Sequence, residues 1–101
     1  MDDIKEIVFD DAKLAEYRKT RDDIDVVLDL MEFKFTLTSQ IRANNEFGDR
    51  TDEWKRSITS LIIRVKSRIA EVRRDVRASG RGQKLNEAID DLRDERDEDN
   101  G

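Results

Sequence analysis

Apolar positions recur along this chain with helical spacing, in two long stretches separated by one break. In the second stretch, residues 52–78, apolar side chains alternate four and three residues apart along a single seam. The seam is formed by Ile58, Ile62, Val65, Ile69, Val72 and Val76. Such a seam covers an arc of roughly 100°, which suits one neighbouring helix. The pattern therefore predicts a long helix that buries one face.

The first stretch, residues 10–45, has more apolar surface than one neighbouring helix can cover. One flank carries Val26, Leu30, Phe33, Leu37 and Ile41, and the other carries Val27, Leu28, Met31 and Phe35. Together the two flanks span an arc of roughly 220°, about twice what a single packed neighbour covers. Residues 33–38 alternate like a strand, but the helical pattern on both sides of them favours a helix. We therefore expect two surfaces to pack against this helix.

Capping residues mark where the two predicted helices begin and end. Asp10 suits the N-cap of the first helix, and residues 44–48 contain the Asn and Gly residues of a turn. Thr51 suits the N-cap of the second helix, and Gly80 suits the position just after its end. The short connection between the helices predicts an antiparallel pair.

The sequence thus predicts an all-α fold with three parts. Residues 1–9 form an N-terminal arm, for which helical and extended conformations both remain open. Residues 10–82 form an antiparallel helical hairpin of two long helices. Residues 83–101 form a short third helix, amphipathic through Leu85, Ile89 and Leu92, followed by a disordered acidic tail.

Three kinds of neighbour could cover the second flank of the first helix: a second copy of the chain, a different protein, or the third helix folding back. We favour self-association, with a dimer completing a helical bundle, because the third segment is short and offers few large apolar residues. In this interpretation Met31 and Phe35 meet the second long helix. The interface between copies is formed by Val26, Leu30, Phe33, Leu37 and Ile41.

Charge is distributed in three blocks. Residues 1–46 carry 7 basic and 12 acidic side chains, residues 47–84 carry 11 and 5, and residues 85–101 carry 2 and 8. The net charges are −5, +6 and −6, so the formal net charge of −5 conceals a basic middle.

The basic middle raises the alternative of a nucleic-acid-binding protein. A stripe along the second helix and its end could follow a phosphate backbone. Its members are Lys55, Lys66, Arg73, Arg77, Arg81 and Lys84. The competing interpretation is neutralisation by the acidic first helix in the antiparallel pair. That register places Asp29 level with Arg68, and residues 22–23 level with residues 73–74.

A further alternative concerns the acidic tail. A small acidic protein can occupy the nucleic-acid-binding surface of another protein, acting as an inhibitor or mimic. The carboxylates of residues 90–99 would then stand in for phosphates. A solvated tail explains the same composition.

The composition argues against an enzyme. The chain has no cysteine and no histidine, which excludes disulfides, the common zinc sites and Ser-His or Cys-His nucleophile pairs. No run of carboxylates has the order of a calcium loop. We therefore expect no catalytic residues, no cofactor and no metal.

We also expect no membrane association and a cytoplasmic location. No stretch approaches the roughly 18 apolar residues of a membrane span, and residues 1–9 lack the basic start of a signal peptide. The sequence predicts a non-catalytic, self-associating interaction module. It would act as an adaptor, assembly factor or small structural component, of a kind that phages and mobile elements encode.

Overall fold

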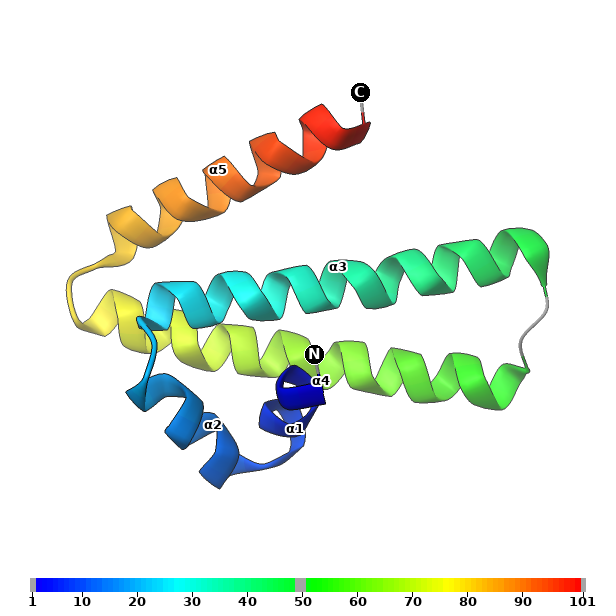
Figure 1. Ribbon diagram of the computed structural model, residues 1–101, viewed down its shortest axis with the longest axis horizontal. Coiled ribbons are helices and arrows are strands. Elements are labelled where there is room, and N and C mark those ends of the chain that lie inside the picture. The colour runs from blue at the N-terminus through cyan, green and yellow to red at the C-terminus, as the bar shows by residue number, and fades with distance from the viewer. Residues whose placement is uncertain (1, 49–50, 101) are drawn as a thin grey trace.

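The computed structural model describes residues 2–48 and 51–100, with side chains at 4–45, 48 and 51–95. Within these ranges the chain forms helices and no strand (Figure 1). The helices are α1 (Asp2–Phe9), α2 (Asp11–Lys19), α3 (Asp23–Phe47), α4 (Asp52–Ala78) and α5 (Gly82–Asn100). The prediction of an all-α fold is confirmed.

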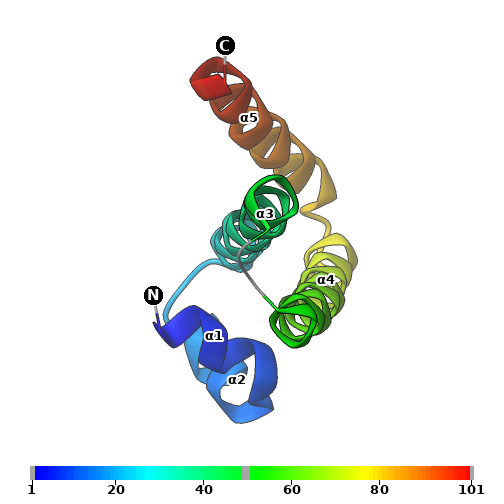
Figure 2. The same cartoon turned by 90° about the vertical axis from the view of Figure 1, so that its right-hand side faces the viewer.

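Helices α3 and α4 form the expected antiparallel hairpin and lie side by side along their length (Figures 1 and 2). The predicted seam of α4 faces the core: Val65, Ile69, Val72 and Val76 are buried. Nearer the turn, Ile58 and Ile62 are partly buried. Full burial of an aliphatic side chain stabilises the fold by about 1.5–3 kcal/mol, so this seam contributes most at the end of the hairpin away from the turn.

The hairpin begins later than the sequence predicted, because the first predicted helix is broken. Asp10 is the N-cap of α2, as predicted, and its side chain accepts from Ala12 N at 2.9 Å. However, α2 ends at Lys19 and a second N-cap follows, where Asp22 accepts from Ile24 N at 3.0 Å. Asp22 satisfies the same capping rule as Asp10, but it lies inside a continuous helical pattern.

The break lets the N-terminal residues fold back against the hairpin. Helices α1 and α2 lie on one side of it, opposite α5 (Figure 2). The open question about the N-terminal arm is answered for residues 2–9, which form helix α1; Met1 lies outside the described residues. Ile7 and Val8 are buried in the same core cluster as Leu14 of α2. These helices supply apolar surface that the sequence analysis did not assign to the core.

The predicted ends of the long helices are close to those observed. Thr51 caps α4 by accepting from Trp54 N at 3.2 Å. Helix α3 runs slightly past Asn45 to Phe47, and Gly48 ends it in the left-handed conformation with φ 65°. At the other end of α4, Gly80 has φ 82°, and the N–H of Arg81 donates to the carbonyl of Val76 at 3.1 Å. This is a Schellman ending, which reverses the chain into α5.

Helix α5 is longer than predicted. Leu85 and Ile89 are buried and Leu92 is partly buried, which agrees with the predicted amphipathic face. The helix then continues to Asn100, so the segment expected to be a disordered acidic tail is helical. Towards its C-terminus α5 diverges from α3 (Figure 1), so it covers one end of α3 and leaves the rest of that face open.

Candidate functional site

The predicted interface flank of α3 lies largely inside the single chain. Val26 and Leu30 are 0% exposed and Leu37 is 4% exposed, all within the main core cluster. Phe33 and Ile41 are partly exposed. The chain's own helices therefore cover most of the surface that we expected a second copy to cover.

The other flank of α3 is partly covered: Val27 is buried, Leu28 and Met31 are partly buried against the core, and Phe35 is exposed. Met31 and Phe35, which we expected to meet the second long helix, line a hollow between α3 and the diverging part of α5. Phe35 is 39% exposed, which places it among the three large apolar side chains with extensive exposure in the described range, together with Phe9 and Ile63. Phe35, which we expected to meet the second long helix, is thus exposed at this hollow, whereas most of the predicted interface flank lies in the core.

We refer to this hollow as the α3–α5 groove; its volume is about 300 Å³. Helix α3 supplies most of the lining and α5 supplies the facing side. The lining residues are Met31, Lys34, Phe35, Thr38, Ser39, Arg42, Leu92 and Arg93. The Thr38 hydroxyl donates to the Lys34 carbonyl at 3.0 Å, so it is already bonded along its own helix. The groove combines an apolar floor with cationic edges.

The described residues that line the α3–α5 groove carry charge of one sign. Among them Lys34, Arg42 and Arg93 are cationic and none is acidic. Within the part of the chain that the structure describes, none of the three forms an ion pair. An apolar surface edged by unpaired cations suits a partner that carries apolar groups and carboxylates.

The predicted phosphate-binding residues do not form one cluster. Lys55 and Arg77 are separated by roughly 33 Å along α4, at 1.5 Å per residue. Lys66, Arg77 and Lys84 are exposed, whereas Lys55 and Arg73 are partly buried. The Nε atom of Arg73 is shielded from solvent and has no hydrogen-bond acceptor in the described range.

Arg81, the remaining predicted phosphate-binding residue, already forms an ion pair within the chain. Its guanidinium donates to both carboxylate oxygens of Asp22, at 2.9 and 2.7 Å. This bond, with the backbone N–H of Ile24, lowers the pKa of Asp22. Lys84 adds to the positive field at the same carboxylate. The C-terminal end of the basic stripe therefore neutralises the start of α3.

Among the described residues, none of the ion pairs predicted between the two long helices forms. Asp29 accepts from the Tyr17 hydroxyl at 2.7 Å instead of pairing with Arg68. Asp23 is bound by Arg18, which also reaches Asp75 of α4 at 2.8 Å. The broken first helix explains the difference, because α2 inserts its own cations and hydroxyls beside the acids of α3.

Arg68 is the most connected charged side chain in the described range, and the sequence analysis gave it no special role. Its Nε donates to the carbonyl of Val8 at 3.1 Å, and its terminal nitrogens bind Glu71 at 3.0 Å and Asp11. Its side chain is 13% exposed. No sequence signal distinguishes it from the other arginines of α4, because its partners come from helices that the sequence placed elsewhere.

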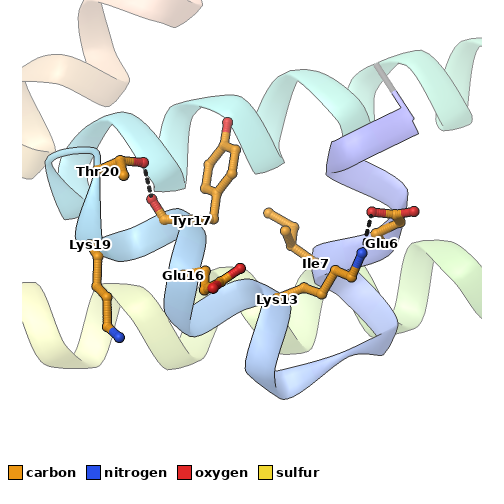
Figure 3. Close-up of a pocket in the computed structure, with 7 residues that line it drawn as sticks. All are labelled: Glu6, Ile7, Lys13, Glu16, Tyr17, Lys19 and Thr20. Atoms are coloured by element: carbon orange, nitrogen blue, oxygen red, sulfur yellow. Dashed lines mark hydrogen bonds and ion pairs between the residues drawn. The ribbon is translucent and has the colours of Figure 1, made fainter.

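A second hollow of about 510 Å³ lies between α1 and α2 (Figure 3). Lys13 and Glu6 bridge it at 3.1 Å, and both side chains are about half exposed. Tyr17 lines the hollow and its ring points towards α3 (Figure 3). Its hydroxyl donates to Asp29 at 2.7 Å. The Lys13–Glu6 ion pair and these bonds give the hollow a structural explanation.

No group of three or more Asp or Glu side chains among the described residues is arranged to hold a metal ion. No helix in the described range is long and apolar enough to cross a bilayer.

Comparison with known proteins adds no assignment: no family model, no curated protein and no solved structure matches this chain.

Proposed function

We propose that this chain is a non-catalytic helical interaction module that self-associates through the α3–α5 groove. The observation that supports the proposal is the partly open apolar flank of α3, where Phe35 is 39% exposed beside Met31 and Leu92. Complete burial of a fully exposed Phe or Met side chain is favourable by about 1.5–3 kcal/mol, and burial of Phe35 against a second surface would add the part that its 39% exposure leaves. The proposal keeps the self-association that the sequence predicted and moves it to the other flank.

The proposed role is that of an adaptor, assembly factor or small structural component acting in the cytoplasm. Its supports are the open groove and the absence of a nucleophile–base pair or metal-ligand cluster among the described residues. Nucleic-acid binding receives less support, because Arg81 is bound by Asp22 and Arg73 is partly buried. The remaining exposed cations of the stripe, Lys66, Arg77 and Lys84, are spread over α4 and the start of α5.

Light scattering after size exclusion, across a concentration series, tests the proposal. We expect the wild-type mass to rise to a multiple of 11.9 kDa. Phe35→Glu should return it to the monomer mass, because the substitution puts a carboxylate into the apolar contact. Helicity by circular dichroism should be retained, since Phe35 is partly solvated already.

Ile63→Glu is the matched control. Ile63 is 61% exposed on α4 and lines a different surface, beside Asp11 and Arg64. The same change of side chain should leave the mass of the assembly unaltered. A wild-type monomer at every concentration would overturn the proposal. Dissociation by Ile63→Glu but not by Phe35→Glu would move the interface to the other side of the hairpin.

A further inference from the structure

The surface best suited to fill the α3–α5 groove is present on the chain itself. The groove has cationic edges, and α5 carries the densest run of carboxylates in the sequence. On the outer side of α5, Glu87, Asp90 and Asp94 are exposed. In the described range none of these three carboxylates forms an ion pair. Two unpaired surfaces of opposite charge therefore coexist on one molecule.

The two charged rows have matching lengths. Lys34 and Arg42 are eight residues apart on α3, a separation of roughly 12 Å along the helix axis. Glu87 and Asp94 are seven residues apart on α5, a separation of roughly 10.5 Å, with Asp90 between them. Spacings of three, four and seven residues put side chains on one face of a helix. One α5 could therefore present its carboxylates to both cations of the α3 row.

The α5 of the same chain does not make this contact. It enters the α3–α5 groove through Leu92 and Arg93, and none of the described side chains that line the groove is a carboxylate. Its apolar residues Leu85 and Ile89 are already buried in the core. Because α5 diverges from α3 towards its C-terminus (Figure 1), the space beside the α3 cations remains available to a second helix.

We propose that the α3–α5 groove of one copy receives α5 of a second copy, and that the exchange is reciprocal. This inference rests on the self-association proposed above and names the segment responsible for it. In a two-fold contact the same surfaces meet on both copies, so both grooves are filled together. The carboxylates of the incoming α5 lie against Lys34 and Arg42, which gives the contact its charge complementarity.

Charge reversal on each side of the proposed contact tests the inference. The groove variant carries Lys34→Glu and Arg42→Glu, and the helix variant carries Asp90→Lys and Asp94→Lys. Each variant alone should self-associate about tenfold or more weakly than the wild type, because both contacts of its dimer become repulsive. Analytical ultracentrifugation at low salt measures the dissociation constants, and circular dichroism verifies helicity.

Mixing the two variants gives the decisive measurement. In a mixed dimer each groove faces an α5 of opposite charge, so an equimolar mixture should recover the affinity of the wild type. The matched control carries Arg56→Glu and Arg74→Glu on α4, where both side chains are exposed and have no ion pair in the described range. It changes the net charge as much as the groove variant does, and its affinity should remain near that of the wild type.

The possible failures are distinguishable. A wild-type monomer overturns the proposed function and this inference with it. A wild-type dimer that both reversals leave intact overturns this inference alone and leaves self-association standing. Weakening by each reversal without recovery in the mixture also overturns it, because the two charged rows would then not face each other.

Discussion

Arg68 connects three helices through one side chain. From α4 it binds the Val8 carbonyl at the end of α1, Asp11 at the start of α2 and Glu71 on its own helix. The Val8 carbonyl lies in the last turn of α1, where helix carbonyls lack partners and the dipole favours a cation. Arg68 therefore satisfies a helix end and an ion pair at once.

We expect Arg68→Met to lower the free energy of unfolding by about 1–3 kcal/mol, because the Val8 carbonyl and the carboxylates lose their donor while the apolar stem is kept. Urea denaturation followed by circular dichroism measures the change. Arg56→Met, at an exposed position of α4, should change stability by less than about 0.5 kcal/mol. Equal stability of the two variants would contradict a docking role for Arg68.

The ion pair between Asp22 and Arg81 predicts a pH dependence. The hydrogen bonds from Arg81 and from Ile24 N lower the pKa of Asp22 below its usual value of 3.8. The pair therefore stabilises the fold fully above that value, and the contribution is lost as pH falls through the lower folded-state pKa. Asp22→Asn keeps a good N-cap residue and removes the charge.

The stability of Asp22→Asn should accordingly lie below that of the wild type at about pH 7 and converge with it below about pH 3. Urea midpoints of both proteins at the two pH values measure this. A constant difference across the range would show that the carboxylate charge is not responsible.

At the scale of elements, the turn after α4 decides where α5 goes. Gly80 has φ 82°, and a Cβ added there would meet no atom within 4 Å. Its requirement for glycine is therefore conformational and not steric. The turn reverses the chain so that Leu85 and Ile89 reach the core.

Gly80→Ala should lower the free energy of unfolding by about 1 kcal/mol, the cost of a left-handed conformation for a residue with a Cβ. Thermal or urea denaturation detects the loss. Gly80→Asn should cost less, because Asn tolerates this conformation better. An alanine variant as stable as the wild type would mean that the turn adopts another conformation.

At the scale of the whole molecule, packing is uneven along the hairpin. Helix α2 and the start of α5 lie near the end where α3 begins and α4 finishes, and α1 lies beside the middle of α4 (Figure 1). Away from the turn, Val26, Leu30, Val72 and Val76 have almost no exposure. Towards the turn, α3 and α4 pack mainly against each other, and Phe35 is partly exposed. The proposed self-association adds helices where the chain has fewest of its own.

Local features of the sequence were sufficient to predict the central hairpin. The seam of α4, the N-caps at Asp10 and Thr51 and the ending at Gly80 depend on residues close together in the chain. The apolar face of α5 followed from the same periodicity. The break at Asp22 had a local signal, because Asp22 is a good N-cap residue and acidic residues follow it. The helical spacing of apolar residues continues across the break, so the sequence favoured one uninterrupted helix.

The sequence by itself determined that the chain is helical, where α4 lies, and that α3 has apolar surface on two flanks. Helix periodicity and capping depend on residues close together in the chain, so they can be predicted from the sequence. Only the tertiary structure decided which neighbour covers which flank. That choice depends on α1, α2 and α5 meeting α3 and α4 from distant parts of the chain. It buries Val26 and Leu30, leaves Phe35 at the α3–α5 groove, and gives Arg68 and Asp22 partners 57 to 60 residues away.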